Sequence, residues 1–195
     1  MECTAGGSKT GDGEVLDKAI INSHTLVPCK FTALFKIISY LLVASVAFLI
    51  FLGGNVKSHE AGLAVPDWPT SFGYNMFTFP VEYWVGGIFH EHFHRLVASA
   101  VGVVTIALVV VSYLYEKRRT VRLLSYLALA VVCIQGILGG LTVLFGLPAW
   151  TSVLHGMLAQ IFFCLTITIA FYYSNFTLSG VNRIAQGENF RLMRL

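Results

Sequence analysis

Residues 86–115 of the chain read GGIFHEHFHR and then LVASAVGVVTIALVVVSYLY. The second part, Leu96 to Tyr115, carries no charge and is long enough for a helix that crosses a bilayer, which takes about 20 residues. The first part gathers three histidines, a glutamate and an arginine where that helix would emerge into water. Ionisable groups at such a depth are costly and often functional. The stretch therefore predicts a membrane-spanning helix with a site at its start.

The composition extends this prediction to the whole chain. Of the 195 residues, 56% are hydrophobic and only 12% are charged, about half the charge of an average soluble domain. Three further apolar runs are long enough to span a membrane, at residues 37–54, 123–145 and 152–174. We predict an all-α membrane protein, a bundle of four transmembrane helices with a long outer loop, residues 55–90, between the first two helices.

The distribution of lysine and arginine predicts the topology. These residues lie in the N-terminal tail, in the turn at residues 116–122 and in the C-terminal tail, and only Lys57 and Arg95 lie elsewhere. The positive-inside rule then places both termini in the cytoplasm. We expect a bacterial-type cytoplasmic (inner) membrane, with the site facing the outer, periplasmic side. The net charge of +3 is a topology signal, so membrane lipid is the expected partner and nucleic acid is not.

The chain divides into three parts. We predict that residues 1–30 form a polar, disordered cytoplasmic tail. Residues 31–175 are expected to form the four-helix bundle, and residues 176–195 a second cytoplasmic tail. The outer loop is rich in aromatic residues and contains three prolines, which exclude a long helix. Two interpretations of this loop stay open: it caps a ligand held by the helix ends, or it is only an interfacial anchor.

Two histidines stand at similar depths in helices that run in the same direction. His94 lies about one turn into the second helix, and His155 lies about one turn into the fourth. Paired histidines on separate helices of a bundle can ligate a haem iron from both sides. Ala98 and Gly102 follow His94, and Gly156 and Ala159 follow His155, as small residues that would leave room for a flat macrocycle. The pair predicts a haem or metal site.

The neighbours of His94 suggest supporting roles. Arg95 could reach outward to pair with a haem propionate or with Glu91, and Glu91 could orient a water or move a proton. The segment from His90 to His94 also satisfies the H-E-x-x-H pattern of zinc proteases, in which two histidines bind zinc and the glutamate is the base. This pattern has only three fixed positions. A zinc membrane protease is therefore a remote alternative.

Several motifs resemble those of the haem A synthase family of cytochrome oxidase assembly proteins. They are, in chain order, GLAVPDWPT at residues 62–70, EHFHR at 91–95, QGILGGL at 135–141 and HGMLAQ at 155–160. The resemblance runs from about residue 53 to residue 171. It implies an oxidoreductase that converts a ring methyl of haem O to a formyl group. It also implies that His94 and His155 ligate haem iron, that Glu91 is catalytic and that Arg95 belongs to the cofactor-binding motif.

The resemblance implies haem B as cofactor, haem O as substrate, or both, with haem O synthase and an electron donor as partners. Family members are similar to two fused bundles, each with a histidine pair, whereas this sequence has one pair. A homo-oligomer or a second half-chain would then complete the enzyme. The loop lacks the cysteine pair of some relatives, so no redox role is inferred for it. The alternative is a non-catalytic haem-binding or haem-transfer assembly factor, or a b-type electron carrier.

Overall fold

The computed structural model describes residues 29–173. In chain order its elements are α2 (Cys29–Ser58), the 3-10 helices η1 (Met76–Thr78) and η2 (Val81–Tyr83), α3 (Gly86–Tyr115), α4 (Arg119–Leu144) and α5 (Ala149–Tyr172). The described residues contain no strand, only an isolated bridge between Ser71 and Tyr74. Four of the helices are long and apolar enough to cross a membrane. The predicted all-α, four-span fold is confirmed, while the predicted tails lie almost wholly outside the described residues.

The helices extend further than the apolar runs predicted. α2 begins at Cys29, inside the predicted tail, and continues through Gly53 and Gly54 to Ser58. α3 begins at Gly86, so its polar first turns are helical. The long loop therefore covers residues 59–85 rather than 55–90. Helix formation continues beyond the apolar run because contacts with the loop satisfy the polar side chains, as described below.

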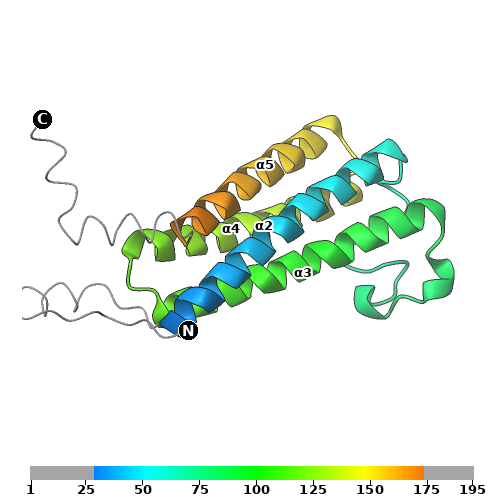
Figure 1. Ribbon diagram of the computed structural model, residues 1–195. Coiled ribbons are helices and arrows are strands. Elements are labelled where there is room, and N and C mark those ends of the chain that lie inside the picture. Colours follow the sequence, from blue (N-terminus) through cyan, green and yellow to red (C-terminus); the bar gives the residue numbers. More distant parts are fainter. Residues whose placement is uncertain (1–28, 174–195) are drawn as a thin grey trace, which may run out of the picture.

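The four long helices form an antiparallel bundle (Figure 1). α2 packs against α3 and α5, and α4 packs against the same two helices, so α3 and α5 lie diagonally across the bundle. Apolar side chains such as Leu42, Leu108 and Ile169 fill the core. Thr105 and Ser125 are also buried there, where each donates to a carbonyl of its own helix. Such small residues allow close helix contact in membranes.

The outer surface of the bundle is apolar. Large residues such as Ile37, Val103 and Leu123 are more than 60% exposed. In a soluble protein such a surface would cause aggregation, whereas lipid tails solvate it well. With the four spans, this surface makes the chain an integral membrane protein. We call the end where α3 and α5 begin the histidine end, because it holds His94 and His155, and the other the opposite end.

A buried ionic cluster closes the opposite end. Glu116 follows α3, and its carboxylate accepts hydrogen bonds from Arg118 Nε (3.0 Å) and Nη2 (2.9 Å) and from the Tyr173 hydroxyl. The Arg118 guanidinium also lies 4.9 Å from the centre of the Tyr173 ring. That ring stacks on Phe35 of α2, with centroids 4.6 Å apart. One cluster therefore joins all four helices at this end.

Candidate functional site

His94 and His155 face the interior of the bundle from diagonal helices. Each ring lies against a glycine of a neighbouring helix: a methyl group at Gly53 of α2 would stand 3.3 Å from His94 Cε1, and one at Gly139 of α4 would stand 3.0 Å from His155 Cε1. The two rings are also close enough to interact electrostatically. The structure therefore brings together the two predicted ligands, and two glycines provide the space that their rings occupy.

Both histidines leave a buried nitrogen without a partner. Nδ1 of His94 and Nδ1 of His155 are buried and make no hydrogen bond within residues 29–173. The backbone carbonyl of Gln135 lies beside the His155 ring but does not meet hydrogen-bond geometry. An unpaired buried polar group costs about 1–3 kcal/mol. Such groups are uncommon in native structures and call for a specific explanation, such as a ligand.

Gln135 adds a third unpaired atom at the same end. Its Nε2 donates to the carbonyl of His155 at 2.9 Å, which confirms the interhelical hydrogen bond that a polar residue in a span predicts. Its Oε1 is buried without a partner in the described part of the chain. Methyl groups at Gly102 and Gly156, two of the predicted space-making residues, would meet nothing within 4 Å. Gly156 is exposed, however, and Gly102 lies further along α3, so the unsatisfied polar atoms are what distinguish the histidine end.

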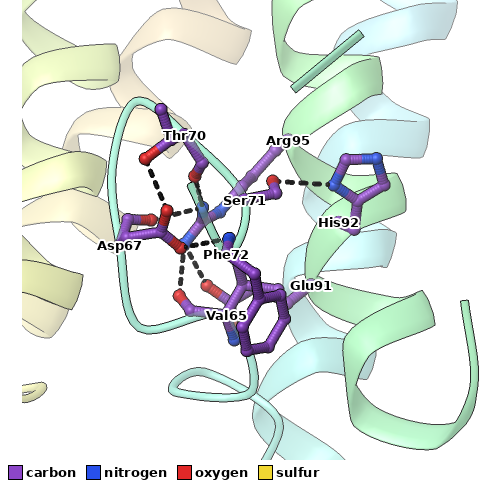
Figure 2. Close-up of polar contacts among 8 residues, drawn as sticks. All are labelled: Val65, Asp67, Thr70, Ser71, Phe72, Glu91, His92 and Arg95. Atoms are coloured by element: carbon purple, nitrogen blue, oxygen red, sulfur yellow. Dashed lines mark hydrogen bonds and ion pairs between the residues drawn. The ribbon is translucent and has the colours of Figure 1, made fainter. Parts of the chain in front are cut away.

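Arg95 clamps the long loop to α3 (Figure 2). Its Nη1 donates to the carbonyls of Asp67 (2.7 Å) and Thr70 (3.1 Å), and its Nη2 donates to the Val65 carbonyl (2.8 Å) and to Glu91 Oε1 (2.5 Å). These four contacts use every N–H of the two terminal nitrogens. Of the two predicted partners of Arg95, the structure shows Glu91. A propionate could bind these nitrogens only by displacing the loop.

Glu91 takes part in the same clamp. Its side chain is buried, and its Oε2 accepts the backbone N–H of Val65 at 2.8 Å. Both carboxylate oxygens thus have partners, one in the loop and one on Arg95. In this arrangement the carboxylate holds the loop against α3.

Asp67 organises the segment that Arg95 holds. Its carboxylate accepts the Thr70 hydroxyl (2.5 Å) and the backbone N–H groups of Phe72 (2.8 Å) and Gly73 (2.9 Å). Burial alone would raise the pKa of Asp67, but the hydrogen bonds from Gly73 and Thr70 help to outweigh it and lower the pKa below the ordinary value of 3.8. The carboxylate therefore stays ionised where it fixes the turn.

His92 is a contact that the sequence did not single out. It is fully buried, its Nδ1 lies 3.1 Å from Ser71 Oγ, and its ring packs against Phe79 and Trp84 at centroid distances of 4.9 and 4.7 Å. His92 precedes His94 by only two residues, which puts the two side chains on different faces of the helix, and that offset was the available signal. His92 faces the loop, whereas His94 faces the bundle interior.

The loop also reaches α4. The Trp68 ring occupies the position where a side chain at Gly140 would stand, with ring atoms 2.4 to 2.8 Å from that point. Gly136 and Gly140 form a GxxxG pair, which predicts close approach of two helices, but a methyl group at Gly136 would meet nothing within 4 Å. Gly140 therefore accommodates an indole ring of the loop. The loop bridges α3 and α4 next to Gly139, which contacts His155.

The described residues 29–173 do not form the ligand set that a zinc protease would need. His90, the first histidine of the H-E-x-x-H pattern, stacks on His59 with centroids 4.1 Å apart, whereas His94 lies against Gly53. Within residues 29–173, no three histidine, cysteine, aspartate or glutamate side chains gather in a metal-binding group. The two histidines of the pattern thus contact different parts of the protein and do not form a pair.

The fold and the site define the class: an integral membrane bundle of four helices with a histidine pair in its interior at one end. The family model described as cytochrome oxidase assembly protein (COX15-CtaA) matches residues 36–195. The chain belongs to this family. It is also similar to the heme A synthases of Listeria monocytogenes and Listeria innocua, at 25% identity over 130 residues. That alignment covers 65% of this chain and 40% of each relative, so the chain spans less than half the length of these relatives. No solved structure matches it.

Proposed function

We propose that the chain binds haem between His94 and His155 and contributes one haem site to the formation of haem A. The observation that carries the proposal is the pair of interior imidazoles, each with a buried, unpartnered nitrogen. The matched family and the relatives called heme A synthase supply the reaction class. In this proposal a bound haem would supply iron chemistry for oxidising a ring methyl of haem O to a formyl group, while the oxygen atom and the acceptor of the electrons come from outside the chain.

The residues around the pair fit a haem. Gly53 and Gly139 leave space for the imidazole rings. One ring nitrogen of His155 could ligate the iron while the other donates a hydrogen bond, which is the usual arrangement of a ligating histidine. The haem is haem B as cofactor, haem O as substrate, or both in turn. A second copy of the chain or a partner half supplies the second histidine pair of the complete enzyme.

A non-catalytic haem-binding role is the second candidate, and the state of Glu91 favours it. A catalytic carboxylate needs a free oxygen near the reacting group, whereas both oxygens of Glu91 have partners in the loop clamp. The chain would then hold or transfer haem, or carry electrons as a b-type cytochrome. Haem A formed in cells that express this chain with a source of haem O, but no other family member, would exclude this candidate.

The experiment is an absorption spectrum of the purified protein, with pyridine haemochrome analysis of the extracted pigment. We expect a six-coordinate, low-spin haem in the native protein and loss of that spectrum in His94→Ala and His155→Ala. His90→Ala is the matched control because His90 lies one turn before His94 on α3 but stacks on His59, and it should keep the haem. Full haem stoichiometry in both histidine variants, or a native protein that stays colourless after haem addition, would overturn the proposal.

A further inference from the structure

The long loop folds back along α3 instead of projecting beyond the end of the helix (Figure 1). Ser71 contacts His92, and Asp67 and Thr70 contact Arg95. His92 lies six residues after the start of α3 at Gly86, and Arg95 lies nine residues after it. At a rise of about 1.5 Å per residue, these contacts lie about 9 and 14 Å along the helix from its first residue. The loop therefore flanks the first three turns of α3.

The length of α3 sets the depth of those turns in the bilayer. The helix has 30 residues, which is about 45 Å at the same rise. A bilayer is about 40–45 Å thick with its headgroup regions, and its hydrocarbon core is about 30 Å. A helix of this length crosses the whole bilayer with about 7–8 Å in each headgroup region, so positions 9 to 14 Å from its start lie in the outer part of the hydrocarbon core, just below the headgroups. The loop lies beside α3 at that depth.

The exposed surface of the loop is largely apolar, with Asn75, Thr78 and Glu82 interspersed. Between Trp68 and Phe89 the only charged residue is Glu82. Six apolar or aromatic side chains of this part of the loop are between 45% and 73% exposed: Phe72, Tyr74, Phe77, Val81, Tyr83 and Val85. We call these six residues the loop face. It adjoins a hollow lined by Phe72, Tyr74, Phe79, Tyr83 and Ile88.

The loop is held too firmly to turn these side chains inward. Arg95 and Asp67 fix its first half through the contacts described above. In its second half, Asn75 caps η1 by accepting the N–H of Phe77 at 2.9 Å, and the Trp84 indole donates to the Phe79 carbonyl at 3.3 Å. The loop face is thus a fixed apolar surface, and tyrosine and phenylalanine are the residues favoured where a membrane meets water.

We propose that the loop face is a lipid-binding surface, embedded where headgroups meet hydrocarbon in the leaflet at the histidine end, with the hollow receiving an acyl segment. The helix that follows the loop also exposes apolar side chains near its start, such as Phe89, so the same bilayer can cover both. Apolar burial at about 25 cal/mol per Å² favours this placement over exposure to water. The inference does not depend on haem binding.

Spin-label accessibility in lipid nanodiscs tests the proposal. A nitroxide is attached at Phe77→Cys and, separately, at Val81→Cys, in a full-length chain whose four native cysteines are replaced by serine. Lys117→Cys, in the exposed turn before α4, is the aqueous control. We expect oxygen to collide with the labels at 77 and 81 more often than a water-soluble nickel complex does, with a ratio several-fold higher than at 117.

Two results would overturn the proposal. A collision ratio at both loop positions equal to that at 117 would place the loop face in water. Low accessibility to both reagents at 77 and 81 would mean that protein covers the surface, as a second copy of the chain would. Val81→Cys guards against a folding defect at position 77, and an unfolding temperature like that of the cysteine-free chain verifies both variants. Colourless protein serves equally well, so failure of the haem proposal would leave this test intact.

Discussion

The two ends of the bundle differ in how their buried histidine and glutamate side chains are paired. At the histidine end, Nδ1 of His94, Nδ1 of His155 and Oε1 of Gln135 are buried without partners in the described residues. At the opposite end, both oxygens of Glu116 accept hydrogen bonds, from Arg118 and from Tyr173. A group left unsatisfied inside a protein costs stability. The difference indicates that the cluster at the opposite end holds the fold together, although within residues 29–173 Ser112 Oγ is buried without a partner there too. It also fits the ligand site that we propose at the histidine end.

Electrostatics at the opposite end follow the same logic. Burial alone would raise the pKa of the Glu116 carboxyl, but the hydrogen bonds from Arg118 and Tyr173 outweigh it and hold the pKa below its ordinary value of 4.5. Burial, and then the hydrogen bond to Glu116, raises the pKa of the Tyr173 hydroxyl. Glu116 is thus ionised and Tyr173 is a neutral donor at neutral pH. The cluster is a closed set of matched donors and acceptors.

The largest effect on stability is expected when this closed set is broken. Glu116→Ala removes the acceptor for Arg118 and Tyr173, and the loss of charged hydrogen bonds to a partly exposed arginine should lower the free energy of unfolding by about 2–3 kcal/mol. Arg119→Ala, which changes an exposed arginine one residue after Arg118, should change it by less than about 0.5 kcal/mol. Denaturant unfolding in detergent measures both. Equal stability of the two variants would contradict the structural role of the cluster.

A smaller effect, confined to the ligand, is expected at the histidine end. Gly139→Ala places a methyl group 3.0 Å from His155 Cε1, which forces the ring to shift. We expect haem to bind about tenfold more weakly, equivalent to about 1.4 kcal/mol, with little change in the stability of the haem-free protein. Gly136→Ala, on the same helix but with nothing within 4 Å, is the matched control. Haem titration followed by absorbance compares them, and indistinguishable affinities would contradict the placement of the ring.

The sequence predicted what depends on local pattern. The four spans follow from runs of apolar residues, and the His94 and His155 pair follows from two polar residues at matching depths. The helix boundaries could not be predicted in the same way. The first turns of α3 look too polar for a buried helix, and only the loop makes them acceptable, because the backbone of Val65 reaches Glu91 across 26 residues of chain.

Contacts between distant residues carry no local signal. Tyr173 donates to Glu116 from 57 residues away, and no periodicity links the two positions. Gly53 continues α2 and packs against the ring of His94. A glycine shows only that a side chain is absent. The group that occupies the vacant space is determined by the packing of the helices.

The smallest effect on stability is expected from a change of pH. It tests the charge of Glu116 at the opposite end without changing the size of the side chain. The pKa of Glu116 is lowered in the folded protein, so folding favours its ionised form, and the stabilisation is fully present above the ordinary value of 4.5. It is lost progressively as the pH falls below 4.5 and through the lowered pKa. Unfolding measured from pH 7 to 3 should show native protein losing its advantage over Glu116→Gln only below about pH 4.5. A difference between the two proteins that stays constant down to pH 3 would mean that Glu116 acts through its shape and not its charge.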